Sequence, residues 1–403
     1  MASGRQVMRG KETSLRNGPG LRKRFLYLKW VAYPLLINMY LLAFIEITEA
    51  SPLEIKPGLQ LSERYIENSD STLNVHSEER VSTATGSLSM VYQPVGLNLS
   101  AGYSLSPSYS SGNPDSRYLG QEGNISLTAD RPRWSTSLTG KLVSTRFIDQ
   151  IVEYNQVAVS QNNNYYQKSG SLGGSYSISR ISNLSMTYSY TGNIYDAGSL
   201  YNSETQSASG SLSYSWTAKS QFAFSGSGNL YSYQNGGRSK SVSAMMDWSY
   251  VFSPFTTSQI GGGGGLSSGY YRFFAADAGL TRKFKNGAGQ ITYSRGINSG
   301  GGYTAVPVIN QNVAVNVSET VLGQLSGSVS GALGESVSSY ANTAFNLRYW
   351  NIGISLSYPI LKWLGSSLSY NHYDQKSIGV TEDHSSYDQV LISLSSSFLP
   401  WRF

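Results

Sequence analysis

The sequence predicts an all-β chain, an antiparallel transmembrane β-barrel of the outer-membrane type with about 18 strands, within a range of 16 to 18. Three observations predict this fold. Apolar and small polar residues alternate with a period of two, as in residues 97–106, LNLSAGYSLS. The polar positions carry very few charges. The connectors between the alternating segments are short and long in turn.

The period of two indicates strands whose two faces meet different surroundings. In residues 97–106, Leu and Tyr occupy one face, and Asn, Ser and Gly occupy the other. The same pattern recurs along the chain, notably in residues 183–195, 208–216, 242–252, 312–319, 323–333 and 351–359. A soluble sheet usually covers its polar face with Lys and Glu, whereas this polar face is mostly Ser, Gly, Asn and Thr. We therefore expect lipid on the apolar face and an aqueous lumen on the polar face.

Composition excludes several other classes of protein. The chain has 403 residues, with 30 Tyr, 42 Gly, no Cys and 13% charged residues, against the usual share of about 25%. So little charge is unusual for a soluble enzyme, and so many aromatic residues are unusual for a disordered chain. The absence of Cys excludes disulfides, haem attachment through Cys and thiolate metal sites, and we expect no cofactor.

The positive charge is confined to the N-terminal segment. Residues 1–50 contain 8 Lys and Arg and 3 Asp and Glu, so this segment supplies most of the formal net charge of +6. The rest of the chain is nearly neutral and has no basic stripe. We therefore expect no nucleic-acid partner.

Residues 1–50 have the organisation of a cleaved signal peptide. The basic LRKR at 21–24 precedes the apolar run VAYPLLINMYLLAFI at 31–45, and TEA at 48–50 offers a small-residue cleavage site. A retained inner-membrane anchor is the alternative. No apolar stretch long enough for a membrane helix follows, so we expect residues 51–403 to cross the bacterial outer membrane as strands. The expected partners are outer-membrane lipid and the barrel assembly machinery.

The connectors provide an independent test of the barrel. Short connectors are expected near residues 94–96, 130–133, 179–182, 217–220, 253–255, 285–289, 318–323 and 359–362, and longer ones between them. Only residues 267–270 break the alternation, because they are short where a long connector is due. An even number of strands places both ends of the barrel segment on the periplasmic side.

The C-terminal residues SFLPWRF resemble the sorting signal of outer-membrane barrels, with Leu399, Trp401 and Phe403 at alternate positions. The preceding apolar residues Val390, Ile392 and Leu394 have the opposite parity, and Pro400 intervenes. A bulge, or a strand that ends at Leu399, would reconcile the two registers.

Motifs with possible chemistry are few. GLSSG at 265–269 matches the pattern of serine hydrolases, but it lies between strand-like segments instead of on a strand–helix elbow. GGGGG at 261–265 lacks the Lys-Ser/Thr of a phosphate loop, so we interpret it as a strand whose backbone approaches a neighbouring strand or loop closely. His76 and His384 fall near acidic residues on the long-connector side, where they are either solvated or ligands of a divalent cation; His372 is the third histidine.

Three charged residues are candidates for the lumen-facing side: Lys141, Asp247 and Asp277. Such scattered charges either pair with other side chains inside the barrel or act as a selectivity filter. A strongly ion-selective pore would show opposed charged rings. We favour structural pairing.

The segment at residues 57–74, PGLQLSERYIENSDSTLN, resembles the opening of bacterial outer-membrane β-barrels that are encoded with exosortase (PEP-CTERM) systems and exopolysaccharide loci. The resemblance implies a barrel connected with polysaccharide export and with polysaccharide or export proteins as partners, and it implies no catalytic residues. Glu67 stands where this pattern usually has Asp. The matching positions are Pro57, Leu59, Leu61, Glu63, Tyr65 and Asn68.

The sequence thus predicts a non-enzymatic barrel that acts as a passive channel or export conduit for hydrophilic, weakly charged solutes. Three alternatives remain open. The first is a scaffold barrel with a plugged lumen that binds or sheathes a partner, for example a multihaem cytochrome. The second is an enzyme at the barrel rim. The third is a soluble or surface β-solenoid.

Overall fold

The computed structural model describes residues 53–402, apart from residues 71–74, 112–116, 147–163, 197–201, 235–236, 269–270, 299–306, 322, 339–345 and 379–382. The predicted signal peptide at residues 1–50 and Phe403 lie outside the described residues, so the signal peptide stays a prediction. Residues 51–403 form one compact unit. Among the described residues, no helix has the length and hydrophobicity needed to cross a bilayer.

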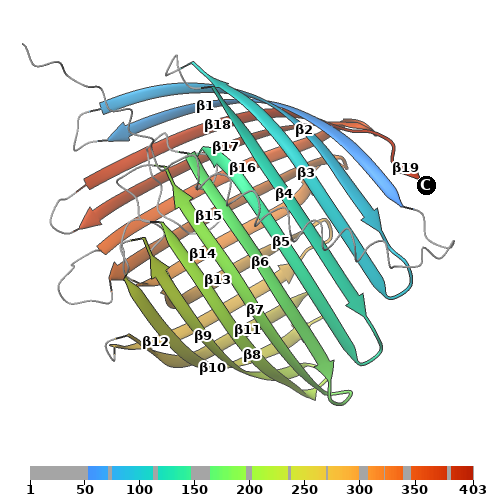
Figure 1. Ribbon diagram of the computed structural model, residues 1–403, viewed down its shortest axis with the longest axis vertical. Coiled ribbons are helices and arrows are strands. Elements are labelled where there is room, and N and C mark those ends of the chain that lie inside the picture. Colours follow the sequence, from blue (N-terminus) through green and yellow to red (C-terminus); the bar gives the residue numbers. More distant parts are fainter. Residues whose placement is uncertain are drawn as a thin grey trace, which may run out of the picture. The chain divides into compact units, whose positions relative to one another are not determined.

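Eighteen antiparallel strands close into a barrel, as the alternation predicted (Figure 1). Each strand pairs with the next along the chain, and β1 pairs with both β2 and β18, which leaves no open sheet edge. The strands are β1 (Glu54–Asp70), β2 (Val75–Tyr92), β3 (Leu97–Ser110), β4 (Arg117–Asp130), β5 (Trp134–Arg146), β6 (Asn164–Ser177), β7 (Ser182–Tyr195), β8 (Ser203–Thr217), β9 (Ser220–Tyr233), β10 (Arg238–Ser253), β11 (Thr256–Ser267), β12 (Tyr271–Lys283), β13 (Gly287–Asn298), β14 (Val308–Val321), β15 (Leu325–Ser338), β16 (Asn346–Leu361), β17 (Leu364–Ile378) and β18 (Asp383–Ser397), followed by the two-residue β19 (Trp401–Arg402).

The connectors differ between the two ends of the barrel. One end has tight turns, such as residues 218–219 between β8 and β9 and residues 362–363 between β16 and β17. At the other end the connectors include residues 147–163 and 299–307. The short connector at β11–β12 is confirmed, since only residues 268–270 join these strands. The connectors of β1–β2, β9–β10 and β17–β18 were expected to be long, and this expectation is wrong, because each has only four residues. We call the two ends the short-turn end and the long-connector end.

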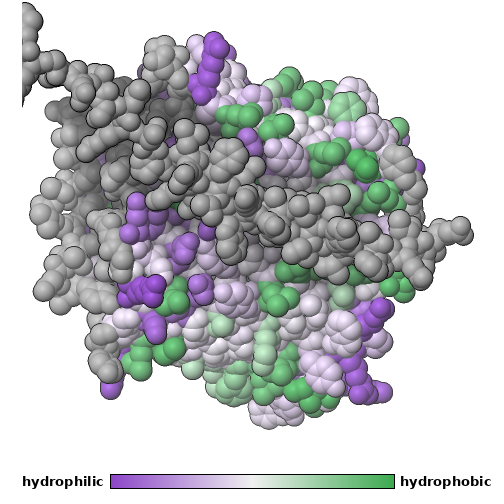
Figure 2. Space-filling model, viewed as in Figure 1, coloured by the Kyte–Doolittle hydropathy of each residue, from purple (hydrophilic) through white to green (hydrophobic). Residues whose placement is uncertain are grey.

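The cross-strand register places the apolar and the small polar residues on opposite faces of the wall. Leu394 of β18, Leu61 of β1 and Ala84 of β2 are direct neighbours in one row, and their side chains lie on the exposed apolar face. The opposite face carries serines such as Ser108 and Ser393, which are buried. Figure 2 shows apolar side chains gathered over the visible outer surface of the strands. The apolar face therefore points outward, toward lipid, and the polar face lines the interior.

The outer surface has the height of a membrane. On β16 the outward residues are apolar from Trp350 to Ile360, and the next outward residue toward the long connectors is Arg348. At about 3.3 Å per residue and a strand tilt of about 40°, this apolar segment covers about 25 Å. The chain is therefore a transmembrane barrel of the bacterial outer membrane.

Hydrogen-bonded polar residues mark the boundary of this apolar surface on the side of the long-connector end. Arg295, Gln311, Glu335 and Arg348 occupy one outward row across β13–β16. Arg295 Nη1 donates to Gln311 Oε1 at 2.6 Å, and Gln311 Nε2 donates to Glu335 Oε2 at 2.9 Å. Arg348 Nε donates to Glu335 Oε1 at 3.0 Å and completes the row. We call these four residues the polar collar.

The five-glycine segment of β11 is explained by close approach of the neighbouring strands, which confirms the sequence interpretation. A Cβ atom at inward-facing Gly263 would overlap the carbonyl oxygen of Ala244 on β10. A Cβ at Gly265 would overlap the Phe273 ring of β12. At outward-facing Gly262 a Cβ would meet nothing within 4 Å. The glycines are therefore required on the inner face of β11 and not on its outer face.

The C-terminal residues change register through a break in the strand. β18 ends at Ser397, and the chain pairs again only at Trp401, which lies opposite Ile55 of β1. The break at residues 398–400 lets Leu394 and Trp401 share the outward face despite their opposite parity. Leu399 lies inside this break and is exposed.

Candidate transport lumen

Pairs of hydroxyl groups on adjacent strands line the inner wall. Small polar residues face inward on consecutive strands, so their hydroxyls meet across the pairing rows at hydrogen-bonding distance. The oxygens are 2.7 Å apart in most of these pairs. The pairs Thr83–Ser108, Thr85–Ser106, Ser135–Ser175, Thr139–Ser171, Ser227–Ser243, Ser326–Ser357, Ser328–Ser355 and Ser367–Ser393 are of this kind.

The register places Lys141, the first of the three candidate lumen charges, on the inner face of β5. Its Nζ lies 3.0 Å from Glu122 Oε1 on β4. The two strands are joined by the turn at residues 131–133, which sets Lys141 directly opposite Asn124 and diagonal to Glu122. The side chains of Lys141 and Glu122 are 36% and 48% exposed, so the pair lies at the surface of the interior. Lys141 therefore sits in a neutral ion pair and adds no net positive charge to the lumen.

Asp247 on β10 and Asp277 on β12 also lie on the inner face, where Gly261 of β11 separates them in one row. Because Gly261 has no side chain, both carboxylates lean over its Cα, where a Cβ would overlap an oxygen of each. Gln259 Nε2 donates to Asp277 Oδ2 at 3.1 Å. Oδ1 of Asp247 is enclosed and accepts no hydrogen bond from the described residues. The result is a compact acidic pair on one wall of the interior.

Large side chains gather inside the barrel at the long-connector end. Tyr349 of β16 and Tyr373 of β17 stack with ring centroids 6.1 Å apart and an interplanar angle of 12°. They belong to one buried cluster with Ile66, Leu347 and Tyr387. Tyr118 of β4 packs against the same cluster. This cluster narrows the interior on the side of β16, β17, β18 and β1.

A second contact crosses the interior between strands that are not neighbours. In the described residues, β12 pairs with β13 from Lys283 to Ala276, which lies opposite Arg295. The residues of β12 from Tyr271 to Ala275 are separated from β13. Phe273 and Ala275 pack in a buried cluster with Ile309 of β14. The Tyr231 hydroxyl of β9 donates to the carbonyl oxygen of Ile297 on β13 at 3.5 Å.

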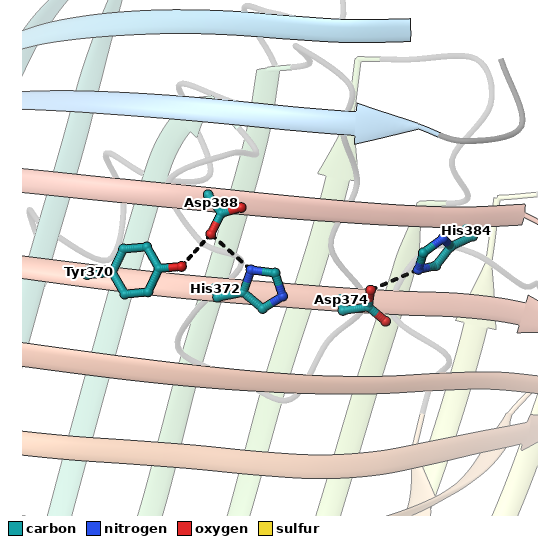
Figure 3. A network of polar contacts seen from close by, with 5 residues as sticks. All are labelled: Tyr370, His372, Asp374, His384 and Asp388. Carbon is teal, nitrogen blue, oxygen red and sulfur yellow. Dashed lines mark hydrogen bonds and ion pairs between the residues drawn. The ribbon is translucent and has the colours of Figure 1, made fainter. Parts of the chain in front are cut away.

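The histidines with described side chains lie on the outer face near the long connectors, and not in the lumen. Figure 3 shows Asp388 of β18 between two side chains of β17. Tyr370 donates its hydroxyl hydrogen to Asp388 Oδ1 at 2.6 Å, and His372 Nδ1 lies 2.9 Å from the same oxygen. His384 Nε2 lies 2.8 Å from Asp374 Oδ2. The described residues contain no group of three such side chains suited to a metal ion.

Two further sequence candidates are placed as follows. Ser267 of the GLSSG segment ends β11 as a buried, inward residue, and residues 265–267 belong to the strand instead of a strand–helix elbow.

In the opening motif Pro57, Leu59, Leu61, Glu63 and Tyr65 share the outward face, and the side chain of Asn68 is not described. Glu63 accepts hydrogen bonds from Arg80 and from Ser82, the latter at 2.9 Å. The side chain of His76 is likewise not described.

Sequence reasoning missed Glu122 and Gln259, the partners of the candidate charges. Glu122 could have been identified from the sequence, because a hairpin centred on residues 131–133 fixes the register between β4 and β5. Gln259 follows in the same way from the β11–β12 hairpin. The buried tyrosines were not predicted. Their parity places Tyr349, Tyr373 and Tyr387 on the inner face, but the cluster that they form there depends on how the neighbouring strands are staggered.

Comparison with known proteins finds likeness in structure alone. No family model matches the sequence, and no curated protein matches it. The crystal structure of OpdQ from Pseudomonas aeruginosa is 12% identical, covers 86% of this chain and 99% of its own, and gives a TM-score of 0.47. OccAB4 of Acinetobacter baumannii is 14% identical, with coverages of 86% and 98% and a TM-score of 0.46. The siderophore receptor PirA of P. aeruginosa is 10% identical, with coverages of 85% and 80% and a TM-score of 0.46. At these values we draw no conclusion about solutes from the likenesses.

Proposed function

We propose that this barrel is a passive channel for hydrophilic, weakly charged solutes. The hydroxyl-lined inner wall is the observation that carries the proposal. Paired Ser and Thr hydroxyls exchange hydrogen bonds with water or with sugar hydroxyls at little net cost, so a polar solute can move along the wall without a deep binding site.

The electrostatics of the interior support weakly charged solutes. Lys141 is neutralised by Glu122, and the acidic pair Asp247 and Asp277 is confined to one wall. A selective ion pathway would need opposed rings of charge. We further propose, from the resemblance of residues 57–74, that the solute is a neutral segment of an exported polysaccharide and that export proteins supply it.

The first experiment is single-channel recording in planar bilayers with the protein purified from outer membranes in detergent. Stable conductance steps with weak selectivity between K⁺ and Cl⁻ are expected. Liposome swelling then compares neutral sugars of increasing size with gluconate and choline of similar size. Discrimination by size supports the proposal, and strong discrimination by charge at equal size would contradict it.

The buried cluster at the long-connector end favours a second candidate, a scaffold barrel whose lumen is plugged or holds a partner. Tyr349, Tyr373 and Tyr387 fill part of the interior, and the contact of Tyr231 with Ile297 crosses it. A barrel that inserts stably but stays electrically silent would support this candidate. Co-purification of a partner whose removal restores conductance would identify the plug.

A further inference from the structure

The charges at the two ends of the barrel are distributed very differently. We define the short-turn rim as the short turns, the three strand residues on each side of them, and the two chain ends of the barrel. This rim contains ten Lys and Arg and three Asp and Glu. Its cations are Lys56, Arg131, Arg133, Arg180, Lys219, Arg282, Lys283, Lys285, Lys362 and Arg402, and its anions are Glu54, Asp130 and Glu319.

The long-connector end is close to neutral by the same count. Its connectors and flanking residues carry seven Lys and Arg and eight Asp and Glu along the sequence. Three of the cations on the outer face near these connectors have protein partners. Arg348 pairs with Glu335, Lys168 Nζ lies 3.6 Å from Glu204 Oε1, and Arg80 pairs with Glu63. The formal charge at this end is therefore close to zero, and three of its outer-face cations are held in ion pairs.

Among the residues that the structure describes, most cations of the short-turn rim have no acidic partner. Within the described part of the chain, the rim's ion pairs are those of Lys56 Nζ and Arg402 Nε with Glu54, at 2.9 and 3.1 Å. Arg133, Lys285 and Lys362 lie at turn tips and are exposed. A surplus of unpaired positive charge at one end attracts anions from outside the protein.

The neighbours of these cations indicate where the anions lie. Arg133 precedes Trp134, Phe284 precedes Lys285, and Lys362 precedes Trp363. Trp134, Phe284 and Trp363 are exposed large side chains at strand ends. Exposed aromatic residues at strand ends occupy the boundary between acyl chains and head groups. A cation next to such a residue is therefore at the depth of the lipid phosphates, which its flexible side chain can reach.

We infer that the short-turn rim is a binding surface for anionic phospholipid, in which the turn cations hold head-group phosphates and the adjacent aromatic residues contact the upper acyl chains. Short turns face the periplasm in barrels of this type, so the lipid is that of the inner leaflet.

Tryptophan quenching tests this surface directly. The full-length chain with Trp30→Phe and Trp350→Phe keeps tryptophans mainly near the short turns, namely Trp134, Trp216, Trp248, Trp363 and Trp401. It is reconstituted with phosphatidylglycerol or phosphatidylcholine carrying the same brominated acyl chains. The expected result is a preference for phosphatidylglycerol, on the order of fivefold for a lipid held by one cation. About 1 M salt should remove the preference, because it screens charges beyond about 3 Å.

Two matched triple variants locate the effect. Arg133→Gln, Lys285→Gln and Lys362→Gln together remove three unpaired rim cations. They should bring the preference ratio of phosphatidylglycerol to phosphatidylcholine close to one. Arg80→Gln, Lys168→Gln and Arg348→Gln together remove three paired cations at the other end and should leave it unchanged. Equal quenching by both lipids in the parent protein, or a preference that survives the rim substitutions, would overturn the inference.

A second measurement separates a lipid surface from attraction of solutes to the pore mouth. Reversal potentials are recorded in bilayers of phosphatidylcholine alone, before and after the rim substitutions. If phosphatidylglycerol is not preferred and the rim variant loses anion selectivity, the cations serve the channel entrance and the lipid inference is wrong. The salt titration on the parent protein decides the matter even if a variant fails to fold.

Discussion

Lys141 on β5 and Glu122 on β4 form an ion pair on the inner wall, with Nζ and Oε1 3.0 Å apart. The pair neutralises the one cation that sequence reasoning placed in the lumen. It lies diagonally across a hairpin and is partly exposed, so its contribution to the stability of the barrel is small, about 0–1 kcal/mol. We expect its main effect to be on the electrostatic potential of the lumen.

Breaking this pair should therefore change ion selectivity more than stability. Lys141→Gln leaves Glu122 uncompensated, so the reversal potential in a KCl gradient should shift toward cation selectivity. The double variant Glu122→Gln and Lys141→Gln should return close to the parent value, because no net charge is left. If the single variant and the parent have the same reversal potential, Lys141 does not face the conducting path.

Glycine at position 263 should be essential, whereas glycine at position 262 should not. Gly263→Ala forces a methyl group against the Ala244 carbonyl oxygen, and such overpacking costs about 1–3 kcal/mol. Gly262→Ala points into open space and should be neutral or mildly stabilising, because alanine restricts the unfolded chain. The temperature at which the heat-modifiable band unfolds on gels measures both, and equal temperatures for the two variants would refute this explanation of the glycine segment.

Asp247→Asn should stabilise the barrel. Two carboxylates share the space above Gly261, so one amide in place of a carboxylate removes their repulsion and supplies a donor to Asp277. We expect a gain of about 1 kcal/mol in denaturant unfolding. The double variant Asp247→Asn and Asp277→Asn should add little further, since the repulsion is already gone. A loss of stability in the single variant would mean that the second negative charge has a counter-ion.

The C-terminal signature should matter for assembly in cells more than for the folded barrel. β19, which contains Trp401, pairs with β1 through only two residue pairs, and β18 already closes the barrel. Deleting Phe403, or changing it to Ser, should reduce the amount of protein in the outer membrane. The same variants should refold in detergent with the parent yield. Reduced refolding in detergent would instead give these residues a structural role.

The barrel and its two faces follow from the sequence alone, but the length of every connector does not. The connectors between β1 and β2, β9 and β10, and β17 and β18 were expected to be long and have four residues each. Side-chain parity in a strand depends only on position, so the alternation of Leu and Tyr with Ser, Asn and Gly specifies the outer and inner faces directly. Residues 97–106 illustrate this, because Leu105 and Tyr103 are exposed on the outer face and Ser108, further along the same strand, is buried on the inner face. The inward placement of Lys141, Asp247 and Asp277 has the same origin.

The contacts that those side chains make are set by the tertiary structure. The pairing of Lys141 with Glu122 and the convergence of Asp247 and Asp277 over Gly261 depend on how neighbouring strands are staggered. The contact of Tyr231 with Ile297 joins β9 to β13 across the interior, between residues 66 positions apart. Parity carries no information about such distances, because it describes one strand at a time. The register of the closed sheet brings these strands together, and that register fixes the charge and the width of the lumen.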